Sequence, residues 1–175
     1  SNSFRHSVLP LIAGAGLPVA LDDARGFDHG TFVPAYVMYP QAQVPLFQIS
    51  LQQGYDPARH LALGRALAPL RDEGVLIVGS GLSYHNLGLF GPQAKVPSAA
   101  FDHWLGGVMD RDPAARTAAL IDWESAPYAR VCHAEEDHLI PLHVALGAAE
   151  GEPATRVYHD EGLFGGVTAS SWRIG

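Results

Sequence analysis

The chain has little lysine, little cysteine and no long apolar run. Of its 175 residues only Lys95 is a lysine and only Cys132 is a cysteine, and the net charge is −7. A nucleic-acid surface needs a basic cluster, so nucleic acid is excluded as a partner. A single cysteine cannot form an internal disulfide and gives no support for secretion. Because no apolar run approaches the roughly 20 residues of a membrane span and no signal peptide is visible, we expect a cytoplasmic protein without a membrane partner.

The rest of the composition is that of an ordinary globular protein, except for its histidines. Hydrophobic residues make up 47% of the chain and charged residues 17%, which is enough apolar material for a sizeable core. At this length we expect one domain, residues 1–175. The nine histidines compare with eleven lysines and arginines together. Histidine is the usual metal ligand and proton carrier near neutral pH, so these residues are the first place to look for chemistry.

The hydrophobic pattern predicts alternating helices and strands. The clearest helix spans residues 56–74, with Asp56 as N-cap, Pro57 in the first turn and Gly74 as a left-handed stop. The β-branched run 75–78 follows at once and is typical of a central parallel strand. Further helices are predicted over residues 4–15, 31–38 (capped by Thr31), 98–109, 113–121 and 135–149 (kinked at Pro141), and further strands over 17–21, 44–50, 155–159 and 166–174. We therefore expect an α/β fold with a central, mostly parallel or mixed sheet flanked by helices.

The segment 79–86, GSGLSYHN, is the first candidate site because it follows the carboxyl end of the predicted central strand. Ligands of open α/β sheets bind just beyond such ends. Gly79 and Gly81 would let the backbone turn sharply and aim His85 and Asn86 into a crevice. The alternative is a structural turn whose histidine bonds to backbone, and position alone leaves both interpretations open.

Two other histidine segments are weaker in isolation. In FDHG at 27–30, a capped loop with a solvated His29 is the simpler interpretation. In CHAEEDHL at 132–139, His133 and His138 would point about 140° apart on one helix and cannot share a metal from it. Glu135 and His138 would share a helix face, as in metal sites of helix bundles, but acidic residues also suit the first turn of a helix.

A nucleophilic site has less support. The segment 81–85 approaches the G-x-S-x-G elbow of serine hydrolases around Ser83, but His85 stands where the last glycine belongs. Cys132 is more typical of a buried, inert thiol. The remaining histidines, His60, His103, His143 and His159, show no partner pattern and are expected at the surface or the edge of the core.

Considered together, several segments carry a resemblance to a known family. In chain order they are GFDHG at 26–30, MYP at 38–40, VPLFQISL at 44–51, HLALGRALAPLRDEGVLIVGSG at 60–81, YHNL at 84–87, FDHWL at 101–105, APYAR at 126–130, EDHLIPLHVALGAA at 136–149 and SSWRIG at 170–175. Their order and spacing resemble the LigB-type, class III extradiol dioxygenases, and most of all the DOPA-dioxygenase-like branch. The resemblance runs from about residue 17 to residue 175. It implies the C-terminal portion of the LigB-like catalytic fold.

The resemblance implies an enzyme that opens the ring of a catechol-type aromatic diol with O₂ at a non-haem Fe(II) site. Zinc is expected as a possible replacement in purified protein, since imidazoles suit both metals. His138 falls on a metal ligand of the family. His85 falls on the acid/base histidine beside the metal, which some relatives use as a ligand. His29 falls on a residue that contacts a substrate hydroxyl, and His133 falls on a variable position in the substrate-binding region.

The chain departs from the family pattern at its start. The resemblance implies two more metal-binding histidines upstream, in an H-G-x-P-like turn and a Ser-x-His-Trp-like strand end, and His6 stands in the wrong context to replace either. Either a front segment precedes these residues, or a second polypeptide supplies it, or the chain is a truncated, non-catalytic relative that acts as a binding or assembly module. An exposed sheet edge would also favour a homo-oligomer. A serine hydrolase using Ser83 is the weakest alternative.

Overall fold

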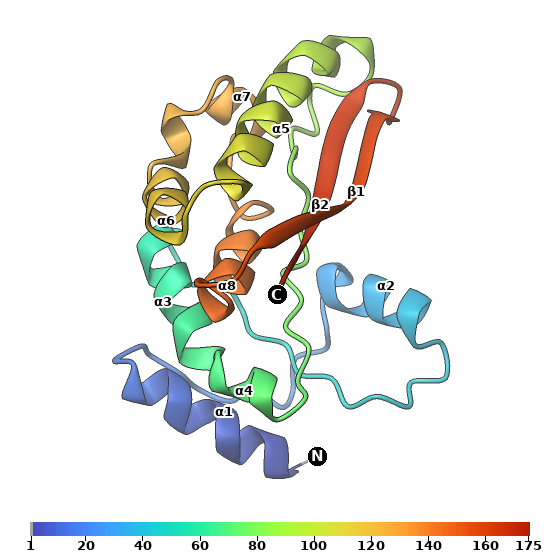
Figure 1. Ribbon diagram of the computed structural model, residues 1–175. Helices are drawn as coiled ribbons and strands as arrows, with labels where there is room; N and C mark the ends of the chain where they lie inside the picture. Colours follow the sequence, from blue (N-terminus) through green and yellow to red (C-terminus); the bar gives the residue numbers. More distant parts are fainter. Residues whose placement is uncertain (1) are drawn as a thin grey trace.

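The computed structural model describes residues 2–175, with side chains from residue 7 onward, so the side chain of His6 lies outside the described residues. Helices predominate and a β-hairpin closes the chain (Figure 1). The elements are α1 (Asn2–Gly14), α2 (His29–Met38), α3 (Pro57–Leu67), α4 (Pro69–Asp72), η1 (Pro92–Ala94), α5 (Lys95–Met109), α6 (Pro113–Ile121), η2 (Trp123–Ser125), α7 (Ala129–Cys132), α8 (Ile140–Ala148), β1 (Ala154–Leu163) and β2 (Val167–Ile174).

Several predicted helix ends are confirmed. The Asp56 side chain caps α3 by accepting from the Arg59 amide, and Gly74 has φ of 78°. Pro69 divides the predicted helix 56–74 into α3 and α4, because proline cannot donate the helical hydrogen bond at that position. The cap of α2 is Asp28 rather than Thr31: the Asp28 carboxylate accepts from the Thr31 amide.

The helix predicted over residues 135–149 is much shorter. Helix α8 begins at Ile140, with Pro141 in its first turn, where the missing amide hydrogen costs nothing. Residues 134–139 instead form a loop of bends and turns. The prediction that Glu135 and His138 share a helix face is therefore wrong, and the loop is free to turn His138 in another direction.

The predicted central, mostly parallel or mixed sheet is not found within residues 2–175. The sheet described there has two strands, β1 and β2, paired antiparallel from Ala154↔Ile174 to Leu163↔Val167. The runs 17–21, 44–50 and 75–78 form no strand and lie outside any ladder. Leu76 is 71% exposed, while Val75 and Ile77 pack inward. A strand requires neighbours for its backbone groups, and an apolar run alone does not supply them.

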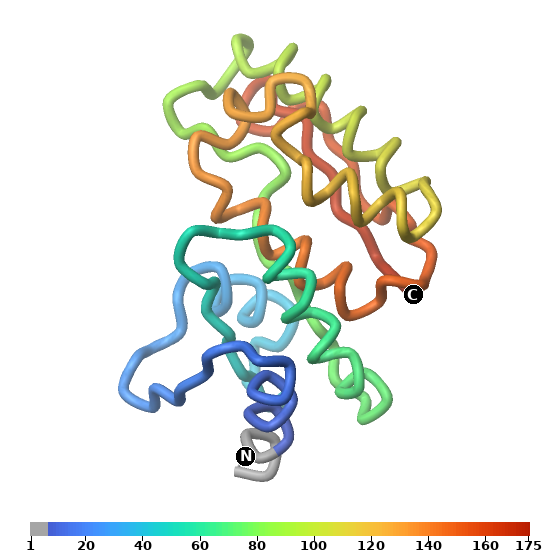
Figure 2. Tube along the Cα trace, turned by 90° about the vertical axis from the view of Figure 1, so that its left-hand side faces the viewer, coloured from blue at the N-terminus to red at the C-terminus, as the bar shows by residue number. Residues whose placement is uncertain are grey.

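The apolar core has two parts. The larger cluster packs α5, α6 and α7 against β2 and includes Phe101, Leu120 and Trp123. The smaller cluster joins α1 to α3 and to the runs 44–50 and 75–78, through residues such as Ile12 and Leu63. Figure 2 shows this division, with α1 and α3 in the lower half and α5 and the hairpin in the upper half.

Helices α3 and α8 cross at two glycines and connect the two parts. A Cβ on Gly64 would lie 2.1 Å from the Val144 carbonyl oxygen, and one on Gly147 would lie 2.2 Å from the Leu61 carbonyl oxygen. Only glycine permits this close backbone approach. The crossing fixes α8, and with it the loop that carries His138.

Within the described part of the chain, every helix is too short or too polar to cross a membrane.

Candidate metal centre

Two segments far apart in sequence are joined by hydrogen bonds to form the site. The Leu82 amide donates to the His138 carbonyl at 3.1 Å, and the His85 amide donates to the Cys132 carbonyl at 2.9 Å. The Asn86 side-chain amide donates to the Val131 carbonyl at 2.7 Å. His85 and His133 also form a parallel β-bridge. This pairing places His85 opposite the loop that carries His138.

Gly79 and Gly81 serve this pairing, but for a different reason from the predicted sharp turn. Neither glycine has a positive φ. A Cβ on Gly81 would lie 2.1 Å from the His138 carbonyl oxygen, and one on Gly79 would lie 2.4 Å from the Pro141 carbonyl oxygen. The glycines thus let the two backbones come together.

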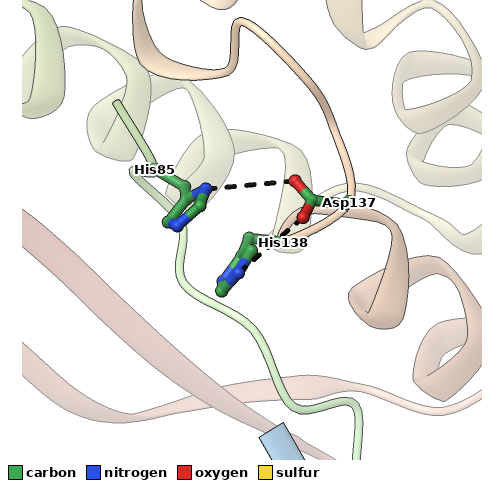
Figure 3. Close-up of side chains that lie close together, drawn as sticks. All are labelled: His85, Asp137 and His138. Carbon is green, nitrogen blue, oxygen red and sulfur yellow. Dashed lines mark ion pairs between the residues drawn. The ribbon is translucent and has the colours of Figure 1, made fainter. Parts of the chain in front are cut away.

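His85, Asp137 and His138 converge in this structure (Figure 3). The rings of His85 and His138 stack with centroids 3.5 Å apart and planes 11° apart. One carboxylate oxygen of Asp137 lies 3.9 Å from His85 Nδ1 and the other lies 3.8 Å from His138 Nε2. One ligand atom from each of the three residues lies within 4.8 Å of the others, and all three side chains are partly buried.

This donor set suits a divalent transition metal. Two imidazole nitrogens and one carboxylate oxygen are the ligands of the facial site of non-haem Fe(II) oxygenases. Burial, followed by the neighbouring His85, lowers the pKa of His138, which favours the neutral ring that keeps a lone pair for a metal. Because that lone pair lies in the ring plane, stacked rings do not point to one centre, and a shared cation requires one ring to turn.

His29 lies beside this group, as the first residue of α2. Its ring is 6.2 Å from that of His138, with the planes 30° apart. The preceding carboxylate does not orient it: Asp28 caps α2 and accepts from the Gln48 side chain at 2.9 Å. His29 is exposed, so the structure brings it to the open side of the cluster.

His133 lies next to the cluster but faces the core. Its side chain is fully buried, with ring contacts to Phe101 and Trp123, and its Nε2 lies 3.1 Å from the Ser83 carbonyl oxygen. Its pKa falls to about 4, mainly because burial penalises the charged ring. Of the four histidines that the sequence singled out, three therefore gather at one surface and His133 lies behind them.

Sequence reasoning missed Asp137, because the acidic run 135–137 also fits the first turn of a helix. Pro141 was the available signal: proline is favoured in the first turn, which moves the helix start past His138. His60 and His143, expected at the surface or core edge, are fully buried. His60 accepts from the Gln52 amide at 3.0 Å, and His143 lies 2.9 Å from the Leu120 carbonyl oxygen.

The fold and this imidazole–carboxylate cluster define an α/β protein with a candidate metal site. A family model described as the catalytic LigB subunit of aromatic ring-opening dioxygenase matches residues 5–174, so the chain belongs to this family. The resemblance drawn from the sequence segments is thereby confirmed.

Individual relatives are similar over most of the chain. A protein of Beta vulgaris named 4,5-DOPA dioxygenase extradiol is 36% identical over 99% of this chain and 66% of its own length. A protein of the same name from Portulaca grandiflora is 38% identical over 89% of this chain and 59% of its own length. The chain thus spans less than two thirds of these relatives.

A solved structure shares the fold. The crystal structure of an uncharacterized protein from Escherichia coli K12 is 30% identical in sequence and superposes with a TM-score of 0.87. The match covers 100% of this chain and 73% of the other. This chain therefore shares its fold with a solved structure.

Proposed function

We propose that this chain contributes to an extradiol dioxygenase that opens the ring of a catechol-type diol with O₂ at a non-haem Fe(II) site. The observation that carries the proposal is the convergence of His85, Asp137 and His138 in a member of the LigB family. The names of the two plant relatives support a dihydroxyphenyl compound such as DOPA as the first substrate to test.

The three converging side chains would hold the metal. His138 and His85 offer nitrogen ligands and Asp137 offers an oxygen ligand, a set that leaves coordination positions for a diol and O₂. When bound, Fe(II) would let electron density pass from the diol to O₂. Zinc fits the same ligands but has no redox chemistry, so a zinc-loaded sample would be inactive.

The proton transfers fall to the imidazoles around the metal. Ring opening breaks one ring C–C bond and adds both oxygen atoms, so the hydroxyl protons must leave and return during the reaction. His85 is the residue that the family resemblance assigns to acid/base work, and its Nδ1 lies 3.9 Å from the Asp137 carboxylate. His29, on the exposed side of His138, is placed to accept a hydrogen bond from a substrate hydroxyl.

The test is single-turnover ring opening. Protein loaded with Fe(II) without oxygen is mixed with DOPA or another catechol, and O₂ is then admitted. We expect a yellow ring-fission product that takes both oxygen atoms from labelled O₂. His85→Ala should keep the fold and part of the metal but lose turnover by about tenfold or more, since general acid–base catalysis contributes about 10²–10⁴-fold.

The control is an imidazole outside the site. His103 is exposed on α5, so His103→Ala should retain wild-type turnover. The proposal would be refuted if His85→Ala kept full turnover, or if wild type with Fe(II) bound gave no product.

The serine hydrolase alternative has little support at Ser83. Its Oγ accepts from the Ser170 amide at 3.3 Å, and His133 contacts its carbonyl oxygen instead of its hydroxyl. A serine nucleophile requires an adjacent base. A phosphonate that labels Ser83 would restore this alternative.

The non-catalytic alternative, a binding or assembly module, is favoured by one observation. Helix α2 has no buried residue, and Tyr36 and Val37 on it are 71% and 75% exposed. Exposed apolar patches often mark interaction sites. Oligomer formation that Tyr36→Ser abolishes, in a protein without ring-opening activity, would favour this second function.

A further inference from the structure

His133 makes one defined polar contact from a fully buried position. Its Nε2 lies 3.1 Å from the Ser83 carbonyl oxygen, while its Nδ1 has no hydrogen-bond partner. Because a carbonyl only accepts, Nε2 carries the hydrogen. Phe101 and Trp123 meet the ring with centroids 5.1 Å and 5.9 Å away, so it has little freedom to turn. Since its pKa is about 4, the ring is neutral near pH 7.

The carbonyl that His133 holds belongs to the strand-like segment of His85. Ser83 precedes His85 by two residues, and the backbones of His85 and His133 form the β-bridge. On its other side, the Ser83 hydroxyl accepts from the Ser170 amide of β2. Ser83 is therefore fixed between the hairpin and His133. Because His85 follows two residues later, the position of Ser83 sets the position of the His85 backbone.

We propose that His133 is a positioning residue of the metal centre: its Nε2–H holds the Ser83 carbonyl and thereby keeps His85 against Asp137 and His138. This inference rests on the proposed function only for the identity of the site. His133 has no contact with solvent and would act through backbone, without touching the metal or the substrate. Removing such supporting groups typically lowers metal affinity by about 10–100-fold.

The chain supplies a matched control in His143. It is also fully buried, and its Nε2 lies 2.9 Å from the Leu120 carbonyl oxygen. Leu120 lies in α6, outside the segments that carry the three converging side chains. Equivalent substitutions at the two histidines should therefore cost similar stability, and only those at His133 should alter the site.

The experiment compares glutamine and methionine at each position. Glutamine keeps an N–H donor, and methionine has a similar shape without one. Zn(II) affinity is measured by calorimetry, at a temperature where urea unfolding shows each variant to be folded. We expect His133→Met to bind Zn(II) about tenfold or more weaker than His133→Gln, and the two His143 variants to bind equally. Equal affinities at position 133, or the same difference at position 143, would overturn the inference.

A second measurement covers the case in which His133→Met does not fold. Nitrogen NMR of histidine-labelled wild-type protein reports which ring nitrogen carries the hydrogen. We expect the Nε2–H form at His133, and the Nδ1–H form would refute the inference. Ring-opening activity is measured separately. If the variants bind Zn(II) in the expected pattern but wild type never opens a catechol, the proposed function is refuted and the positioning role of His133 is retained.

Discussion

Replacing Gly64 by alanine should destabilise the protein at the crossing of α3 and α8. The added Cβ would lie 2.1 Å from the Val144 carbonyl oxygen, 2.8 Å from the Ala148 nitrogen and 2.8 Å from Gly147 Cα. All three are backbone atoms, so the helices must separate. Overpacking a core typically costs about 1–3 kcal/mol, and we expect the upper end here. Alanine has a higher helix propensity than glycine by about 1 kcal/mol, so the free energy of unfolding should fall by about 2 kcal/mol in total.

The matched control is Gly107→Ala. Gly107 lies on α5 with nothing within 4 Å of an added Cβ, so only the propensity gain applies and stability should rise by about 0.5–1 kcal/mol. Urea unfolding followed by circular dichroism measures both changes. If Gly64→Ala were as stable as wild type, α3 and α8 would not be in backbone contact. The position of α8, which begins just after His138, would then need another explanation.

Two further predictions concern stability. The folded pKa of His133, about 4, lies below its unfolded value near 6.5, so the unfolded chain binds this proton first. His133 therefore favours folding fully above pH 6.5, and up to about 3 kcal/mol is lost as the pH falls to 4. Urea unfolding at pH 7 and pH 5 should show a shallower loss for His133→Gln, and identical slopes would contradict this assignment. Glu150 accepts two bonds from Arg65, each 2.6 Å, and one from Thr117, which lower its pKa to about 2. Because solvent screens the pair, Glu150→Gln should cost only about 1 kcal/mol at pH 7, and this cost should disappear as the pH falls from 4.5 towards 2, whereas exposed Glu161→Gln should cost nothing.

Local capping chemistry made several elements predictable. Asp56, Pro57 and Gly74 act through neighbouring backbone, so the sequence is sufficient to place them. The two C-terminal strands were also located correctly: β1 continues to Leu163, beyond the predicted 155–159, and β2 nearly coincides with the predicted 166–174. The strands predicted over 17–21, 44–50 and 75–78 were wrong, because strand pairing depends on partners distant in sequence.

The candidate site was predictable in part for a related reason. The family resemblance singled out His29, His85 and His138, which the structure brings together. Asp137 was missed because its role depends on where α8 starts. The burial of His133 could not be predicted from the sequence either, because its ring faces Phe101 only once segments 82–86 and 131–138 pair.

Crystals of the chain grown with Zn(II) would test the metal centre most directly. An anomalous signal collected at the zinc absorption edge should show one ion about 2.0–2.1 Å from a ring nitrogen of both His85 and His138, with Asp137 as a third ligand. The same map from the double variant His85→Ala/His138→Ala should lack this ion. Zinc bound elsewhere, or bound unchanged in the double variant, would contradict the account.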